Sequence, residues 1–590
     1  MAAEAAVTVP DGYILHTENT SRILLPSTNE AFLNPIQEFN RDISVACITT
    51  WSEELDKAKE AKWQERRSKN TAGSSDKKRL KTTESAPAIS RTTTESNVDS
   101  GKSPEDVVQS DYPKTAEVTQ SPSKYEPKYQ RNKVVILEAL SATGLRSIRY
   151  AKEIPLVKYV IANDLSPSAT AAMKRNIEAN GLGPPLDPED TVNLAAPNPL
   201  GDKAPDRKPK LGMVRINEGD ACALMYNHRT DKNRVDVVDL DPYGTAAPFI
   251  DSAVQCINDG GLLCVTCTDL SVLATTNYPE KCYSNYGGIP VKAEYCHEAA
   301  LRLVLHTVST SAARYGRYIQ PLLSLSIDFY VRLFIRLQSA PIEVKKAASK
   351  TSMYYICTGC QAFYDQPLGR MAEKVHEPSG NVNINFKTHV GPTVPEKCPE
   401  CHSTLHIAGP MWSGSIHDSG FITRLLEHLE SNQDKYGTSP RMKGMLTVAQ
   451  EEIDSPFYFT PSRMAGFFHC ISPSLDDTAS ALLHAGHKVS RSHALPGSLK
   501  TSAARSDVHD VFRSWIKTHP VKMDKISDTS PASQLLAKEA RVEHNFKRHP
   551  QSVTQSSKVK LVRYQQNPTP HWGPGKRADG GKRKRESEDD

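Results

Sequence analysis

The stretch DLDPYG at residues 239–244 places two carboxylates, a proline and a tyrosine directly after the apolar run at 235–238. Exocyclic amines of nucleic-acid bases are poor nucleophiles, and a carboxylate at Asp241 that accepts an amine N–H would favour their methylation. Pro242 restricts the turn, and Tyr243 offers an aromatic face for a base turned out of its helix. We therefore predict that Asp241, Pro242 and Tyr243 are catalytic. For Asp239, a catalytic role and a supporting structural role stay equally open.

Three earlier apolar runs also lead into small or acidic residues. The first is followed by EALSATG at 138–144, the second ends on Asp164, and the third leads to Asp220 and Ala221. An acid in the place of Asp164 accepts hydrogen bonds from ribose hydroxyls, and Asp220 suits an exocyclic amino group. The spacing differs from G-x-G-x-x-G, so we expect a phosphate-free adenosine ligand, S-adenosylmethionine, rather than a dinucleotide. The alternative is an ordinary sheet whose loops are acidic.

Two Cys-x-x-Cys pairs predict a metal site further along the chain. Cys357, Cys360, Cys398 and Cys401 have the two-knuckle spacing of a structural tetrahedral zinc site with no open position. The N-terminus lacks a secretory signal, which favours a reducing compartment and metal over disulfides. The alternative is a subdomain with four reduced thiols.

The elements that must position these residues alternate between strands and helices from residue 134 onward. This order indicates an α/β fold with a parallel sheet, and ligands of such sheets bind at the carboxyl ends of the strands. Ser, Thr, Lys and Glu dominate a long segment with few apolar residues, which predicts a disordered insertion. The predicted organisation is a main α/β domain at 1–345 with the insertion at 57–132, a four-cysteine segment at 346–410, a smaller α+β domain at 411–546 and a basic disordered tail at 547–590.

Charge and hydropathy narrow the partners of the protein. The net charge is +5, and basic residues gather with aromatic ones in the tail, a mixture that suits contacts to an RNA backbone. Lys582–Arg585 reads as a nuclear import signal. No apolar run approaches the length of a membrane span, and no protein partner is evident. Glu4 and Asp11 precede the first arginine and disfavour a mitochondrial presequence, but they leave a mitochondrial fraction open.

Several uncommon motifs occur together and in one order: FLNPIQEFNRD, EALSATGLRSIRYA, AND, EGDA, DLDPYG, SRSHALPGSLKT and a late NP followed by HWGPG. In this combination the chain resembles the tRNA (guanine-26, N2)-dimethyltransferase family, in its eukaryotic form. The resemblance covers nearly the whole chain apart from the insertion and the extreme tail. It implies a class I, Rossmann-like S-adenosylmethionine-dependent domain and a C-terminal domain that binds tRNA. It also implies two successive methyl transfers to N2 of one guanine.

The resemblance also implies roles for individual residues. Arg41 and Arg146 would line the cofactor site together with Asp164, Asp220 and Ala221. Asp241 and its neighbours would hold the guanine, and the four cysteines match a metal site found in members of the family. Two other functions stay open at this point: an adenine N6-methyltransferase, and a non-catalytic RNA-binding or RNA-folding protein. The intact acids at 164, 220 and 241 argue against the second.

Overall fold

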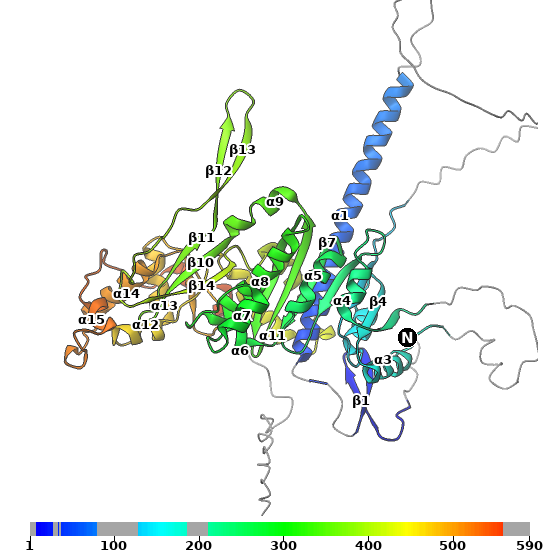
Figure 1. The fold of residues 1–590 in the computed structure, drawn as a ribbon, viewed down its shortest axis with the longest axis horizontal. Coiled ribbons are helices and arrows are strands. Elements are labelled where there is room, and N and C mark those ends of the chain that lie inside the picture. The colour runs from blue at the N-terminus through cyan, green and yellow to red at the C-terminus, as the bar shows by residue number, and fades with distance from the viewer. Residues whose placement is uncertain (1–7, 28–32, 35–36, 80–127, 186–210, 559–590) are drawn as a thin grey trace, which may run out of the picture. The chain divides into compact units, whose positions relative to one another are not determined.

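The computed structural model describes residues 8–27, 33–34, 37–79, 128–185 and 211–558. The described residues, drawn as a ribbon in Figure 1, fall into two units, one within 1–53 and 133–590 and the other within 54–132. The predicted site residues and the four cysteines all belong to the first unit.

A seven-stranded sheet is the centre of the first unit, and numbering its strands along the chain gives the order 3-2-1-4-5-7-6. The first five strands run parallel, as predicted, and two more strands extend one edge. The seventh runs antiparallel to the fifth, and the sixth pairs antiparallel with the seventh and so runs in the same direction as the first five. The apolar runs of the inner strands reflect burial on both faces, whereas the strand at the other edge, Val214–Glu218, is partly exposed. The strands are β3 (Val134–Glu138), β4 (Val157–Asp164), β5 (Val214–Glu218), β6 (Val235–Leu240), β7 (Ile257–Cys267), β8 (Arg317–Ile327) and β9 (Tyr330–Ser339).

The register of the parallel strands brings their carboxyl ends to one edge. Glu138 of β3 lies opposite both Ala162 of β4 and Asp239 of β6, and Asp164 pairs with Glu218. Helices follow these ends and cover the sheet. They are α2 (Leu145–Glu153), α3 (Pro167–Ala179), α4 (Ala221–Asn227), α5 (Ala247–Cys256), α6 (Leu270–Leu273), α7 (Pro279–Tyr286) and α8 (Cys296–Ala313).

The N-terminal region contains the predicted strand pair, β1 (Tyr13–Glu18) and β2 (Ser21–Pro26), and then helix α1 (Glu38–Arg79). The prediction of disorder from residue 57 is wrong for 57–79, which continue the helix; residues 80–127 lie outside the described residues. A polar composition excludes a buried helix but not a solvated one. Here exposed i,i+4 pairs such as Glu65 and Lys69, 2.7 Å apart, support the helix.

The remaining elements follow the sheet. After α9 (Pro341–Lys345) and the 3-10 turn η3 (Ala347–Lys350), strands β11 (Phe363–Pro367), β10 (Thr351–Cys357) and β14 (Leu405–Trp412) form a three-stranded sheet. Strands β12 (Gly369–His376) and β13 (Asn381–Thr388) pair only with each other. The C-terminal part consists of α10 (Ser419–Ser431), η4 (Gln433–Lys435), α11 (Ser439–Glu451), α12 (Pro461–Phe468), α13 (Leu475–His484), β15 (Val489–Arg491), β16 (Leu499–Thr501), α14 (Arg505–Thr518), η5 (Met523–Lys525) and α15 (Pro531–Leu536).

One hydrophobic core crosses the predicted domain limits. Tyr354 of β10, Met411 of β14 and Phe457 are buried together with residues of α8 and of the central sheet. The four-cysteine segment and the C-terminal part therefore share a compact unit with the main sheet. The limits at 345, 410 and 546 stay predictions.

The predicted disordered tail begins later than residue 547. Residues 547–558 contain the short turns η6 (Pro550–Ser552) and α16 (Gln555–Lys558). His549 donates its backbone N–H to Ser480 over 3.0 Å, and Ser556 donates to Glu451 over 3.0 Å. The prediction of disorder is wrong for these residues because their backbone N–H groups form hydrogen bonds with side chains of the C-terminal part. Residues 559–590, with the basic cluster, lie outside the described residues.

Among the helices of the described residues, none combines the length and the apolar character needed to cross a bilayer.

Candidate functional site

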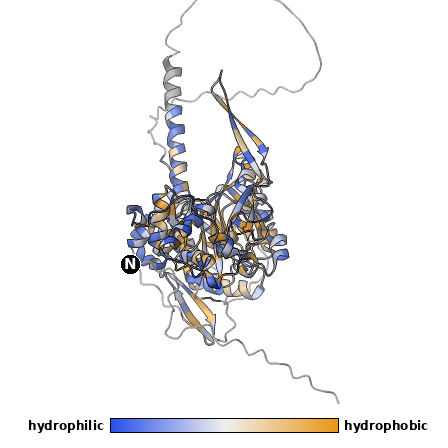
Figure 2. Cartoon of the chain, turned by 90° about the vertical axis from the view of Figure 1, so that its left-hand side faces the viewer, coloured by the Kyte–Doolittle hydropathy of each residue, from blue (hydrophilic) through white to orange (hydrophobic). Residues whose placement is uncertain are grey.

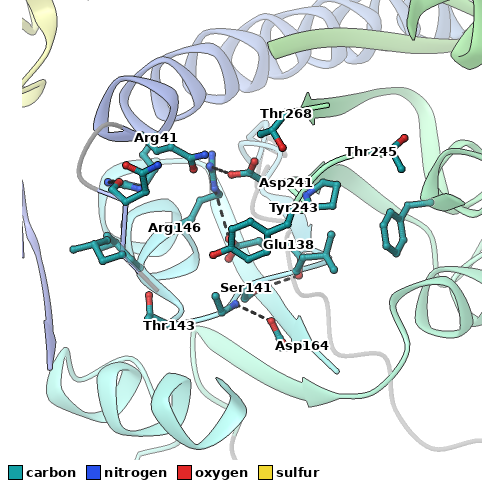
Figure 3. A pocket seen from close by; sticks show the side chains of 18 residues that line it. Arg41, Glu138, Ser141, Thr143, Arg146, Asp164, Asp241, Tyr243, Thr245 and Thr268 are labelled. Atoms are coloured by element: carbon teal, nitrogen blue, oxygen red, sulfur yellow. Dashed lines mark hydrogen bonds and ion pairs between the residues drawn. The ribbon is translucent and has the colours of Figure 1, made fainter. Parts of the chain in front are cut away.

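A cavity of about 430 Å³ opens at the carboxyl edge of the sheet (Figure 3). Its volume falls in the range of roughly 300–1,000 Å³ that is usual for small-molecule sites. It is walled by the residues after β3, β4, β6 and β7 and by the start of α1. Six of the predicted site residues line it: Arg41, Arg146, Asp164, Asp241, Pro242 and Tyr243.

The DPYG turn is held rigidly against the end of β7. Gly244 donates its N–H to the Thr268 hydroxyl over 2.8 Å and accepts the Thr268 N–H over 2.8 Å. Gly244 has φ +84°, a left-handed conformation that favours glycine. Tyr243 is 78% exposed beside the cavity, as an aromatic surface for an incoming ring requires.

Asp241 has one oxygen engaged and one available. Its Oδ2 accepts a short hydrogen bond from the Arg146 guanidinium. Among the described residues no donor reaches Oδ1, and the side chain is 12% exposed. An incoming amine can therefore donate to Oδ1 while Arg146 keeps the carboxylate oriented.

Asp239 is tied into the protein interior. Its carboxylate is fully buried and accepts from Arg332 of β9 over 2.7 and 3.0 Å and from the Tyr150 hydroxyl over 2.5 Å. Burial raises the pKa of Asp239, but Arg332 and Arg146 outweigh it and hold that pKa below its usual value. Of the two roles left open for this acid, the geometry favours the structural one.

Glu138 is a second acid at the cavity wall, and its ionisation differs from that of Asp239. Burial raises the pKa of Glu138 to about 8, against the opposing influence of Arg146, whose Nε lies 3.7 Å from Glu138 Oε1. The Ser147 hydroxyl also bonds to this carboxyl. At neutral pH the group is therefore largely protonated, so it can both donate and accept hydrogen bonds.

Asp164 and Arg41 both line the cavity and lie apart from each other in Figure 3. Asp164 accepts the backbone N–H of Ala142 and of Ser166, each over 2.9 Å, which fixes its carboxylate at the end of β4. Each oxygen keeps a second lone pair for a ligand hydroxyl. Arg41 forms a two-point ion pair with Glu18 over 2.6 and 2.5 Å.

Asp220 and Ala221 are not among the residues that line the cavity. Asp220 is exposed and caps α4 by accepting the Ala223 N–H over 2.7 Å, and Ala221 is buried. The start of α4 nevertheless adjoins the cavity wall, because the Cys222 thiol lies 3.5 Å from the carbonyl of Pro248, next to the lining residue Phe249. Their role in cofactor binding stays a prediction.

Sequence analysis predicts no role for four contributors to the site, Glu138, Phe249, Thr268 and Arg332, although Glu138 belongs to the strand end at 138–144. Thr268 follows the next strand end along the sheet, so the pattern that identified Asp164 and Asp241 could have found it. Arg332 is a charged residue inside the apolar strand β9, which is a signal for a buried partner. The pairing of Arg332 with Asp239 joins residues 93 positions apart, and no local pattern predicts it.

The four predicted cysteines converge on one point. All are buried, and their sulfur atoms lie within 4.8 Å of one another. The Cys357 and Cys401 sulfurs are 3.3 Å apart, and those of Cys360 and Cys398 are 3.8 Å apart. Four sulfurs around zinc at ~2.3 Å would be separated by roughly 3.8 Å, so this donor set fits tetrahedral zinc. Backbone N–H groups of residues 359 and 360 point at Cys357 Sγ, as in a metal knuckle.

A second buried polar group, the junction cluster, joins α8 to the C-terminal part. It consists of Glu298, Arg302, Glu452, His493 and Lys500. Lys500 bonds to Glu452 over 3.1 Å and to Glu298 over 3.3 Å, and Arg302 bonds to Glu298 over 2.9 Å. Two carboxylates thus balance two cations.

His417, Glu452 and His493 each place one potential metal-ligand atom within 4.8 Å of the others. However, backbone N–H groups of Ser324 and Ser326 donate to the two imidazoles over 3.4 and 3.1 Å. A metal ion would add charge beside a cluster that is already balanced, so we assign none here.

Comparison with known proteins decides the family. The family described as N2,N2-dimethylguanosine tRNA methyltransferase matches residues 6–513. The chain belongs to this family. It is 40% identical to a mouse tRNA (guanine(26)-N(2))-dimethyltransferase over 95% of this chain and 76% of the mouse protein. It is also 40% identical to the Schizosaccharomyces pombe enzyme of the same name, over 95% of this chain and 91% of the relative.

A solved structure confirms the predicted fold. The chain is similar to Trm1 from Pyrococcus horikoshii, solved in complex with S-adenosyl-L-methionine, with a TM-score of 0.55 and 21% identity. The likeness covers 86% of this chain and 99% of the archaeal chain.

Proposed function

We propose that this protein transfers two methyl groups from S-adenosylmethionine to N2 of guanine 26 in tRNA. Membership of the family and the names of its relatives support this activity and substrate. The observation that carries the proposal is Asp241 itself. Its unengaged Oδ1 lies at the mouth of a cavity of suitable size, beside an exposed aromatic ring.

The cavity residues divide between the cofactor and the base. We assign Asp164 to the ribose hydroxyls, and Arg41 and Arg146 to the negatively charged end of the cofactor. Phe249 provides an apolar wall on the side of α4, where Asp220 and Ala221 would reach the adenine. Asp241, Pro242 and Tyr243 remain for the guanine, with Tyr243 stacked on its face.

The reaction needs little covalent help from the protein. The cofactor supplies an electrophilic methyl group on a sulfonium. Asp241 Oδ1 would accept one N–H of the guanine amine, orient its lone pair and take up positive charge that develops on nitrogen. The same carboxylate could pass the released proton to solvent. Because N2 of the monomethylated product retains one N–H, the same contact can form for the second transfer.

We further propose that the four cysteines bind a structural zinc ion and that the protein acts in the nucleus, with a mitochondrial fraction. The donor set supports zinc. The basic cluster at Lys582–Arg585 supports nuclear import, and a yeast relative, 39% identical, carries the name of a mitochondrial enzyme. Metal analysis of the purified protein and fluorescence imaging of the tagged protein test these two points.

The decisive experiment is mass spectrometry of nucleosides from a tRNA transcript incubated with protein and cofactor. We expect N2,N2-dimethylguanosine, and no product from a transcript with adenine at position 26. N6-methyladenosine would instead favour the adenine enzyme. Cofactor binding without any methylated nucleoside would favour a non-catalytic RNA-binding role.

A further inference from the structure

The β12–β13 hairpin has two chemically different faces. It lies between the two cysteine pairs in the sequence and projects from the first compact unit (Figure 1). Met371 pairs with Phe386 and Val375 with Val382, so these four side chains share one face. The opposite face carries Arg370, paired with Lys387, and Lys374, paired with Asn383. Hydrophobic and hydrophilic residues accordingly alternate along both strands in Figure 2.

The apolar face has a role inside the hairpin. Isolated two-stranded ribbons are marginally stable in water, and directly opposite apolar pairs each contribute roughly 0.2–1 kcal/mol. Gly380, with φ +66°, closes the turn by donating to the His376 carbonyl over 2.8 Å. At the base, His389 donates to Leu368 over 3.2 Å. These interactions account for the extension of the hairpin without a covering element.

The polar face has no such internal role. Arg370, Lys374 and Lys387 are exposed, and none of the three forms an ion pair or hydrogen bond with the part of the chain that the structure describes. The acids of the hairpin are elsewhere: Glu373 is on the apolar face, and Glu377 is in the turn. Three cations are thus displayed on one side of a narrow ribbon without a neutralising carboxylate.

We propose that this polar face, Arg370, Lys374, Asn383 and Lys387, binds the phosphate backbone of the tRNA substrate. Cationic and amide side chains on a β-ribbon can bind phosphate oxygens. Such contacts give affinity and fix the position of the RNA on the protein without reading its sequence. The inference rests on the proposed function for the identity of the RNA. None of the hairpin residues lines the catalytic cavity, so the hairpin positions the substrate and takes no part in the chemistry.

The test is the salt dependence of tRNA binding by the full chain. In the triple variant Arg370→Gln, Lys374→Gln, Lys387→Gln, the slope of log affinity against log salt should become shallower by roughly 2 to 3, because each phosphate contact contributes about 0.7–0.9. Cofactor affinity and the single-turnover methylation rate at saturating tRNA should stay at wild-type values. These two readouts also show that the variant is folded.

The matched control removes three other exposed lysines, Lys232→Gln, Lys522→Gln and Lys525→Gln. An equal change of slope in the control would mean that net charge alone is responsible. An unchanged slope in the hairpin variant would mean that these side chains make no phosphate contacts. Either result overturns the proposal.

A second variant, Val375→Thr with Val382→Thr, asks whether the apolar face joins two copies. If it lowered the sedimentation coefficient and the triple variant bound tRNA normally, the hairpin would be a self-association surface instead. A wild-type protein that bound tRNA with hairpin-dependent salt sensitivity but did not methylate it would disprove only the proposed function.

Discussion

The catalytic cavity and the junction cluster are both built from buried acids and bases, and they differ in how their carboxylates are used. Glu452 of the junction cluster gives one oxygen to Lys500 and the other to His493, over 3.1 and 2.6 Å, and its side chain is 0% exposed. Asp241 gives one oxygen to Arg146, keeps the other unengaged and is 12% exposed. An exposure of 12% instead of 0%, together with one unengaged oxygen, separates a carboxylate that can act on a substrate from a structural one.

The comparison also applies within the cavity wall. Asp239 lies two residues before Asp241 in the same sequence motif, yet it resembles Glu452, because Arg332 and Tyr150 occupy both of its oxygens. Acids with full sets of partners stabilise the fold, and removal of one leaves buried cations unpaired. Mutation of a fully partnered acid should therefore lower stability, whereas mutation of an acid with an unengaged oxygen should weaken ligand binding or lower the reaction rate.

Replacement of Glu452 should have the largest effect. Although burial raises the pKa of Glu452, Lys500 and the histidines hold it well below its usual value, so the group is charged. Glu452→Gln leaves Lys500 partly unpaired in the interior and should lower the free energy of unfolding by about 3–5 kcal/mol. Denaturant unfolding measures this. The control is Glu451→Gln at the neighbouring position, where one hydrogen bond to Ser556 is at stake and about 1 kcal/mol is expected. Equal losses would mean that the junction cluster is unimportant.

The second prediction concerns Asp241→Asn, which preserves shape and removes the charge. The methylation rate should fall on the order of 10²-fold or more, the scale of one lost transition-state contact. Cofactor affinity should stay near wild type. Single-turnover methylation and cofactor titration measure the two effects. Asp239→Asn is the comparison, and it should lower stability because it leaves Arg332 partly unpaired. A wild-type rate in Asp241→Asn would mean that this carboxylate does not act on the amine.

The third prediction separates cofactor binding from catalysis. Asp164→Ala removes a carboxylate that faces the cavity, and it should weaken S-adenosylmethionine binding by about 1.5–3 kcal/mol if a charge-assisted hydrogen bond is lost. Calorimetric titration measures this. Asp220→Ala tests the acid outside the cavity lining, and we expect a smaller loss. If Asp220→Ala cost as much as Asp164→Ala, the cofactor would extend to the start of α4. If neither changed affinity, both assignments to the cofactor would fail.

Much of the fold could be predicted because its signals are local. Apolar runs of strand length, each followed by small or acidic residues and a helical segment, predicted the parallel sheet. Since parallel strands end at one edge, the strand-end residues Asp164 and Asp241 could be placed together without a structure. The cysteine spacing predicted the cluster of sulfurs for the same reason, because each knuckle is a local turn.

The remaining features depend on pairings between distant residues. Lys500 and Glu298 are 202 positions apart, and nothing around either residue indicates the other. A low content of apolar residues predicts disorder for 57–79, whereas a solvated helix needs few apolar residues. Asp220 was placed at a strand end correctly, but its carboxylate turns to the helix that it caps. The direction of a side chain is decided by such competing donors.

The smallest predicted effect concerns Glu138, which differs from both classes of carboxylate because it is protonated when buried. Its folded-state pKa, about 8, lies above the ordinary value of 4.5. Between these two values the folded protein retains a proton that the unfolded chain has released, so stability must decrease as pH rises. From pH 7 to pH 8 the loss should be at most about 1.4 kcal/mol, the limit for one group over one pH unit. Glu138→Gln carries no titrating proton at this position and should lose less stability over the same interval.

Thermal unfolding of both proteins at pH 6, 7, 8 and 9 measures the difference. Parallel declines in the two proteins would assign the pH dependence to other groups and would mean that Glu138 is ionised in the folded state.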